Sequence, residues 1–165
     1  MTTPARARSR VLAGALLWVA IGGWFGALLL FAAVVAPTAF SMLPDPRLTA
    51  HMVGRVLASL QLAGMGLGVL LAALGGGLGR GRLAVALPLV LAAMCAANHF
   101  GVAPAVAAID LTDPAAGAGA GARFARLHQL SMGLFLATTA GVLLLGILHA
   151  VRELGEEGRK KARIP

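Results

Sequence analysis

A run of apolar residues from position 11 to about position 40 limits what this chain can fold into more than any other feature of the sequence. Only Pro37, Thr38 and small residues interrupt it. A helix of about 20 apolar residues is long enough to cross the hydrocarbon core of a bilayer, which is about 30 Å thick. The run also exceeds the apolar part of a cleaved signal peptide, which is about 7–15 residues long. We therefore expect a retained membrane-spanning helix.

Three more spans are expected downstream of this run. Pro44-Asp45-Pro46 predicts a turn before the second span, because proline does not continue a helix. In the third span the apolar run before Asn98 and His99 is too short to cross a bilayer alone, so the helix must carry both side chains into the outer part of the membrane. Residues 110–121, rich in Gly and Ala, predict a flexible external loop. The four expected spans cover about residues 11–40, 54–78, 83–103 and 126–150.

The composition favours lipid as the solvent. Hydrophobic residues make up 59% of the chain and charged residues 12%, whereas a soluble domain has about 25% charged residues. A chain of 165 residues has too much surface for its volume to hide this many apolar side chains from water. We predict an all-α integral membrane protein, a four-helix bundle.

The positions of the basic residues predict the orientation. Ten of the 14 Lys and Arg residues lie in the two tails and in the turn that contains Arg80 and Arg82. Basic residues collect on the cytoplasmic side of membrane proteins, so we expect both termini inside and the chain in the cell inner membrane. The expected parts are a cytoplasmic N-terminal tail at 1–10, a four-helix transmembrane domain at 11–151 and a cytoplasmic, partly disordered tail at 152–165.

The net charge of +8 does not indicate a nucleic-acid partner. The basic residues flank apolar runs and do not follow one face of a helix or alternate with aromatic residues. The lipid bilayer is the expected partner, with anionic head groups opposite the basic ends of the helices.

Most polar residues of the spans fall near their outer ends. His51, Arg55 and Ser59 are spaced to share one helix face, and Ser131 follows His128 on another. Ionisable groups at membrane depth usually face the interior of a bundle or a watery cavity. We expect an outward-facing polar pocket, although the arginines can also extend to the lipid head groups. Its candidate residues are His51, Arg55, Ser59, Asn98, His99, Arg126, His128 and Ser131.

Signatures of catalysis and of resident cofactors are missing from the sequence. It lacks metalloprotease, nucleophile-elbow and phosphate-loop motifs, and no carboxylate lies within a span. Cys95 and His99 share a helix face near Met94, and such soft ligands suit Cu(I), but no tight ligand spacing accompanies them. We expect no enzyme activity, no metal and no cofactor, and keep copper handling as an alternative.

Glycines form two close spacings that let helices approach one another in lipid. One is Gly22 with Gly26, and the other is the run Gly64-Met65-Gly66-Leu67-Gly68. We expect tight packing within one bundle. A Gly face that binds a second copy or another membrane protein is the alternative, and it would make the chain an accessory subunit of a larger complex.

Short motifs resemble one known family. They are Gly26 with Phe31, Ala36-Pro37-Thr38-Ala39-Phe40, Asn98 with Pro104, and Phe124-Ala125-Arg126-Leu127-His128-Gln129-Leu130-Ser131. Over about residues 11–150 the chain resembles the domain-of-unknown-function 4149 family, bacterial relatives of transmembrane protein 205. The resemblance implies a four-helix membrane domain of no established activity, and it singles out Pro37, Asn98 and His128. A more distant likeness to the copper-resistance D membrane domain rests on His51, His99 and His128.

These patterns leave three functions open. The first is a non-enzymatic membrane protein that handles a small solute or an ion through the outward-facing pocket. The second is copper or transition-metal handling. The third is a structural or accessory subunit of a membrane complex.

Overall fold

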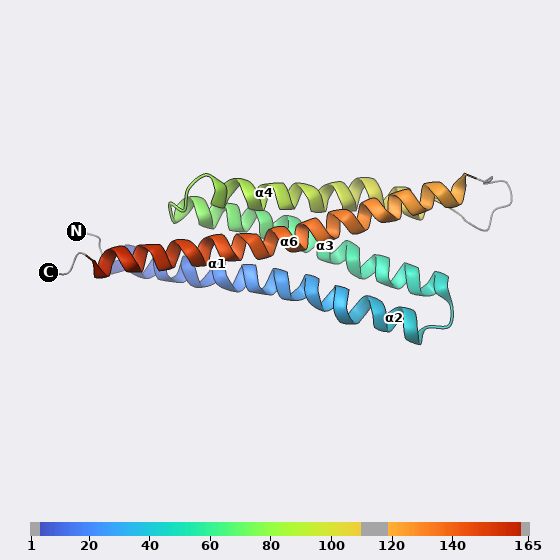
Figure 1. The fold of residues 1–165 in the computed structure, drawn as a ribbon, viewed down its shortest axis with the longest axis horizontal. Helices are drawn as coiled ribbons and strands as arrows, with labels where there is room; N and C mark the ends of the chain where they lie inside the picture. Colours follow the sequence, from blue (N-terminus) through green and yellow to red (C-terminus); the bar gives the residue numbers. More distant parts are fainter. Residues whose placement is uncertain (1–3, 110–118, 163–165) are drawn as a thin grey trace.

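The computed structural model describes residues 4–109 and 119–162, which form four long helical segments arranged up and down in one bundle (Figure 1). Two of the segments change from an α-helix to a wider π-helix and back along their length. In chain order the elements are α1 (Pro4–Leu30), η1 (Phe31–Val35), α2 (Ala36–Met42), α3 (Pro46–Gly77), α4 (Leu83–Ala96), η2 (Ala97–Val102), α5 (Ala103–Ala107) and α6 (Ala120–Lys161).

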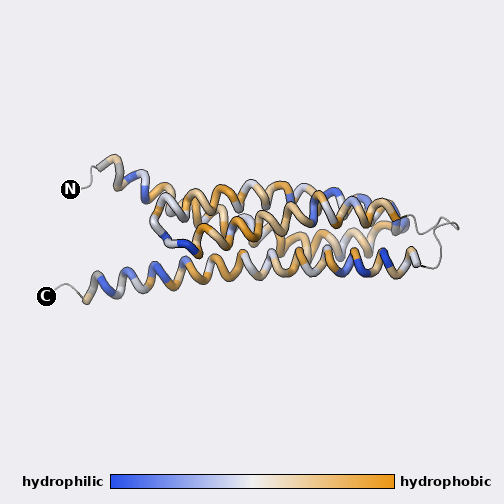
Figure 2. Tube along the Cα trace, turned by 90° about the horizontal axis from the view of Figure 1, so that it is seen from above, coloured by the Kyte–Doolittle hydropathy of each residue, from blue (hydrophilic) through white to orange (hydrophobic). Residues whose placement is uncertain are grey.

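All four segments are long and apolar enough to cross a membrane. Only 22–28% of their most apolar stretches is buried, so most of the apolar surface faces outward, where lipid is the solvent that suits it. Hydrophilic residues gather toward the two ends of the bundle (Figure 2). The prediction of a membrane protein with four transmembrane helices is confirmed. The spans are Ala7–Met42, Arg47–Gly77, Leu83–Ala107 and Ala120–Glu156.

Two short turns connect the spans at opposite ends of the bundle. The first is the predicted break at Pro44-Asp45-Pro46, which is confirmed: the Asp45 side chain accepts a hydrogen bond of 2.8 Å from the Arg47 amide and caps α3. The second turn, between α3 and α4, has Gly79 and Gly81 at φ values of +66° and +86°. Glycine adopts this left-handed conformation without steric penalty, which allows so short a turn.

The helices extend further than the expected tails allowed. α1 begins at Pro4, and α6 continues to Lys161, so the expected disorder of the C-terminal tail is wrong up to that residue. Arg152 and Glu156, one turn apart, form an ion pair of 3.3 Å that supports this extension. Most of the expected loop at 110–121 lies outside the described residues, as do positions 163–165.

The most extensive helix contact is that between α3 and α4, and three glycines of α3 lie in it. A Cβ atom at Gly68 would lie 2.6 Å from the Pro88 carbonyl oxygen, and one at Gly75 would lie 2.7 Å from that of Ala84. One at Gly64 would lie 2.8 Å from the Cys95 sulfur. The expected tight packing of this Gly run within the bundle is confirmed for Gly64 and Gly68.

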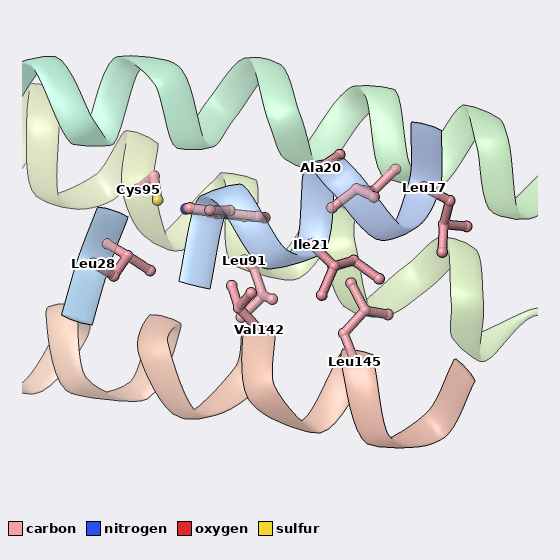
Figure 3. Close-up of a cluster of buried hydrophobic side chains, with 10 residues drawn as sticks. Leu17, Ala20, Ile21, Leu28, Leu91, Cys95, Val142 and Leu145 are labelled. Carbon is pink, nitrogen blue, oxygen red and sulfur yellow. The ribbon is translucent and has the colours of Figure 1, made fainter. Parts of the chain in front are cut away.

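The buried core fills the half of the bundle that contains the Arg80 turn. Helices α1, α3, α4 and α6 all contribute to it, and Figure 3 shows its side chains gathered between the helices. The buried residues of this cluster are Leu17, Ala20, Ile21, Trp24, Leu28, Leu71, Leu91, Cys95, Val142 and Leu145.

Both π-helical segments precede an Ala-Pro pair. The amide of Ala36, before Pro37, donates to the Phe31 carbonyl five residues back. The amide of Ala103, before Pro104, donates to the Asn98 carbonyl in the same way. A proline ring clashes with the carbonyl four residues earlier, and the wider π turn relieves that clash. The second of these widened turns contains Asn98 and His99, so it fixes where their side chains lie.

Beyond the π-helical segments the four helices separate into two pairs. α2 packs against α3, and α5 packs against α6. Figure 1 shows the first pair diverging from the second at the end opposite the two termini. The bundle is therefore closed at one end and looser at the other.

Candidate functional site

Three polar side chains are buried where the packed half of the bundle meets the looser half. Gln61 on α3 is 5% exposed, Asn98 on η2 is 2% exposed and Thr138 on α6 is 3% exposed. Within the span Arg47–Gly77, Gln61 lies 14 residues from one end and 16 from the other. At 1.5 Å per residue this is about 21 Å and about 24 Å, so Gln61 lies close to the middle of the span.

The three side chains line one small cavity to which all four helical segments contribute. Its volume, about 10 Å³ for the centre of a water molecule, is close to the minimum that holds one water. Most of the wall is apolar. The lining residues are Leu28, Leu57, Leu60, Gln61, Met94, Cys95, Asn98, Leu134, Phe135 and Thr138.

The two amides in this cavity are short of hydrogen-bond partners. The Asn98 Nδ2 atom donates a long bond of 3.4 Å to the Ser131 carbonyl. Asn98 Oδ1 and both polar atoms of the Gln61 side chain have no partner within the described part of the chain. A buried polar group without a partner costs about 1–3 kcal/mol, so such groups call for an explanation. A bound molecule that pairs with them supplies one.

The other polar groups of the cavity are bonded within the protein. The Thr138 hydroxyl donates to the Leu134 carbonyl at 2.8 Å, within its own helix. The Cys95 thiol, which is 5% exposed, hydrogen-bonds to the Thr138 side chain. The unpaired polar atoms of the cavity therefore belong to Gln61 and Asn98.

The structure brings only part of the predicted polar pocket together. Asn98 lies in the cavity, and the half-buried Ser131 contacts it through its backbone carbonyl. The predicted face of His51, Arg55 and Ser59 exists, but all three residues are exposed on α3. The Ser59 hydroxyl donates to the Arg55 carbonyl at 3.1 Å and not to another helix.

The remaining predicted residues also lie away from the cavity. Arg126 and His128 are exposed on α6, and the His128 ring stacks on that of its neighbour Phe124 at 5.8 Å. His99 is half-buried, with its ring edge-on to Phe100 at 4.7 Å, and it is not part of the cavity wall. These residues border the looser end of the bundle.

Gln61 and Thr138 were not among the predicted pocket residues, although the sequence carries a signal for each. Gln61 precedes Gly64 by three residues and Gly68 by seven, which places it on the helix face that packs on α4. Thr138 follows Ser131 by seven residues and precedes the buried Val142 by four. Both residues are polar and lie at helical spacing from small or apolar residues that pack inward, and this pattern predicts that they are buried.

A second polar cluster closes the other end of the bundle. Arg80, in the α3–α4 turn, forms an ion pair of 2.6 Å with Glu153 of α6. The Trp18 indole of α1 donates to the same carboxylate at 3.2 and 3.3 Å. Arg152 donates to the carbonyl oxygens of Gly79, at 3.1 Å, and of Arg80. We call Trp18, Arg80, Arg152 and Glu153 the end clasp, because they join α1, the turn and α6.

Metal ligands do not converge at either cluster. No group of three or more His, Cys, Asp or Glu residues able to hold a metal ion occurs in residues 4–109 and 119–162. Of the soft ligands considered above, Met94 and Cys95 line the cavity while His99 does not.

Fold and site together define a small four-span membrane protein with an amide-lined cavity near mid-depth. A family model described as a domain of unknown function, DUF4149, matches residues 19–115, which is more than half of the chain. The chain belongs to this family. The matched segment includes Gln61 and Asn98, and it ends before α6. No match was found among curated proteins or among solved structures.

Proposed function

We propose that this protein is a non-enzymatic inner-membrane protein that admits a small solute from the outer side of the membrane to the cavity between Gln61 and Asn98. One observation carries the proposal: in a cavity near mid-membrane, both polar side-chain atoms of Gln61 and the side-chain oxygen of Asn98 are buried without a partner among the described residues. Polar groups kept at this depth are expensive and usually serve a pathway or a binding site.

The orientation with both termini inside is part of the proposal. Both termini and the Arg80 turn lie at one end of the bundle (Figure 1). The two tails and this turn hold ten of the 14 Lys and Arg residues of the sequence. The positive-inside rule favours this end as the cytoplasmic one. The looser end, where α2 and α5 diverge, then faces outward.

The packing of the two halves supports entry from the outer side. Between the cavity and the cytoplasmic end stand the buried core and the end clasp, and Leu17, Val142 and Leu145 in that core are 0% exposed. On the outer side the two helix pairs diverge. A solute therefore meets less packed protein when it approaches from outside.

Labelling with a membrane-impermeant thiol reagent tests this proposal. Cys95→Ser removes the only cysteine, and Ser131→Cys then places a thiol one turn of α6 outward of the cavity residue Leu134. The reagent therefore reports on the route and does not have to enter the cavity. Leu91→Cys, in the core at 2% exposure, is the matched negative control, and the exposed His128→Cys is the positive control. We expect the reagent, added to intact cells, to label positions 131 and 128 but not 91. Labelling at 128 with none at 131 would contradict the proposed route.

A second candidate, an accessory subunit, is favoured by the other pair of glycines. Gly22 and Gly26 are exposed on α1, and a Cβ atom at either position would meet nothing within 4 Å. Small residues on such a face let another helix approach closely. Crosslinking in native membranes separates the candidates: a crosslink from this face to a different membrane protein supports the accessory role, and recovery of the chain alone contradicts it.

A further inference from the structure

We infer that the mid-membrane cavity selects a small uncharged molecule that both donates and accepts hydrogen bonds, and that water occupies it at rest. The inference deepens the proposed function, since it names the chemical class of the solute. It rests on the proposed function only for the side from which the molecule enters.

The wall of the cavity excludes ions. None of the described residues that line it carries a charged side chain. A metal cation such as Ca²⁺ takes six to eight oxygen ligands, whereas Gln61 and Asn98 together offer two free carbonyl oxygens. A lone anion would face the Gln61 Nε2 group as the one unpaired donor in a largely apolar wall. An unpaired charge in such surroundings is strongly disfavoured.

The unpaired groups match a molecule with both kinds of hydrogen-bonding group. An amide nitrogen carries two donor hydrogens, and an amide oxygen carries acceptor lone pairs. The free atoms are Gln61 Nε2, which donates, and Gln61 Oε1 and Asn98 Oδ1, which accept. A molecule that accepts from the first and donates to the other two satisfies all three atoms. Water does this with one oxygen and two hydrogens.

The size of the cavity sets the size of the resting occupant. A volume of about 10 Å³ for the centre of a water molecule corresponds to roughly one bound water. The remaining wall is made of apolar side chains and the already bonded Cys95 and Thr138. A larger neutral solute would enter only if α3 and α6 moved further apart. The site therefore selects its occupant by size as well as by hydrogen bonding.

Hydroxyl-radical footprinting by X-ray radiolysis detects this water directly. Radicals made from a bound water oxidise the side chains that touch it, and the sulfur-containing residues Met94 and Cys95 line the cavity. Met65, which packs partly buried against the core and does not line the cavity, is the matched reference within the same chain. The probe is water itself, and the sample is the full chain in lipid nanodiscs.

We expect Met94 to be oxidised at least about fivefold faster than Met65, since only the former would contact a bound water. The double variant Gln61→Leu/Asn98→Leu removes the hydrogen-bonding groups at similar side-chain size and should bring the two rates together. Equal rates in the native chain, or an unchanged excess at Met94 in the double variant, would overturn the inference. The comparison of Met94 with Met65 needs no variant, so it holds if the double variant does not fold.

This test can fail independently of the one for the outer route. A wet cavity whose chain carries an unlabelled Ser131→Cys thiol contradicts the route and leaves the neutral site standing. A labelled Ser131→Cys thiol with a dry Met94 contradicts the neutral site and leaves the route standing.

Discussion

The contact between α3 and α4 makes a quantitative prediction about two glycines that are only two residues apart. A Cβ atom at Gly68 would lie 2.6 Å from the Pro88 carbonyl oxygen and 2.7 Å from the Ala92 Cβ. Both atoms belong to or adjoin the α4 backbone, so neither can rotate away. A Cβ atom at Gly66 would meet nothing within 4 Å. Both variants therefore add one methyl carbon. Gly68→Ala adds it to a filled space, and Gly66→Ala adds it to an open one.

The magnitude follows from the distances. An ordinary carbon–oxygen contact is about 3.3–3.6 Å, so Gly68→Ala requires α3 and α4 to separate locally by about 0.7–1 Å. Overpacking of this kind costs about 1–3 kcal/mol. Alanine improves helix propensity over glycine by about 1 kcal/mol at both positions. We expect Gly66→Ala to be neutral or stabilising, and Gly68→Ala to be less stable than Gly66→Ala by about 1–3 kcal/mol.

The single cysteine supplies the assay. Cys95 is 5% exposed in the folded protein, so a fluorogenic maleimide reacts with it when the bundle opens on heating. For a chain of this size, 1 kcal/mol corresponds to about 2–4 °C, so Gly68→Ala should melt about 2–12 °C below Gly66→Ala. Equal melting temperatures, or a higher one for Gly68→Ala, would refute the close approach of the two helices at this point.

Three further predictions use the same thermal assay or purified protein. Asn98→Asp keeps the side-chain shape but places an acid near mid-membrane, so we expect the free energy of unfolding to fall by about 3 kcal/mol. An unaltered melting temperature would contradict the burial of position 98. Glu153→Gln removes the ion pair with Arg80 from the end clasp, at a cost of about 1 kcal/mol or less because Glu153 is partly exposed. It should melt below Glu156→Gln, which removes the exposed pair with Arg152, and equal melting would show that the Arg80 pair adds no more than that exposed pair. Purified protein should hold no copper in elemental analysis, and stoichiometric copper lost in His128→Ala would revive the metal-handling alternative.

The spans and the turns between them could be predicted from the sequence, because each depends on local chemistry. Apolar length predicts the spans, the third one once Asn98 and His99 are included in it, and a proline on each side of Asp45 predicts the helix break there. The shortness of the apolar run before Asn98 places that residue within the membrane, and the structure buries it at 2% exposure. These inferences need no knowledge of which helices are neighbours.

The residues of the site were harder to predict from the sequence, because they depend on which face of each helix packs inward. The i, i+4 spacing correctly groups His51, Arg55 and Ser59 on one face, but spacing does not say whether that face meets a helix or lipid. On α3 the three glycines that approach α4 determine which face of the helix packs inward, and Gln61 lies on that face. The end clasp joins residues more than 70 positions apart, and no local pattern predicts such a contact.

A crystal structure from a lipidic phase, at a resolution that shows ordered water, tests the assignment of the mid-membrane site most directly. We expect density for one small molecule between the side-chain amides of Gln61 and Asn98, within hydrogen-bonding distance of both. A direct hydrogen bond between these two amides, with no density beside them, would contradict the assignment of the cavity as a binding site.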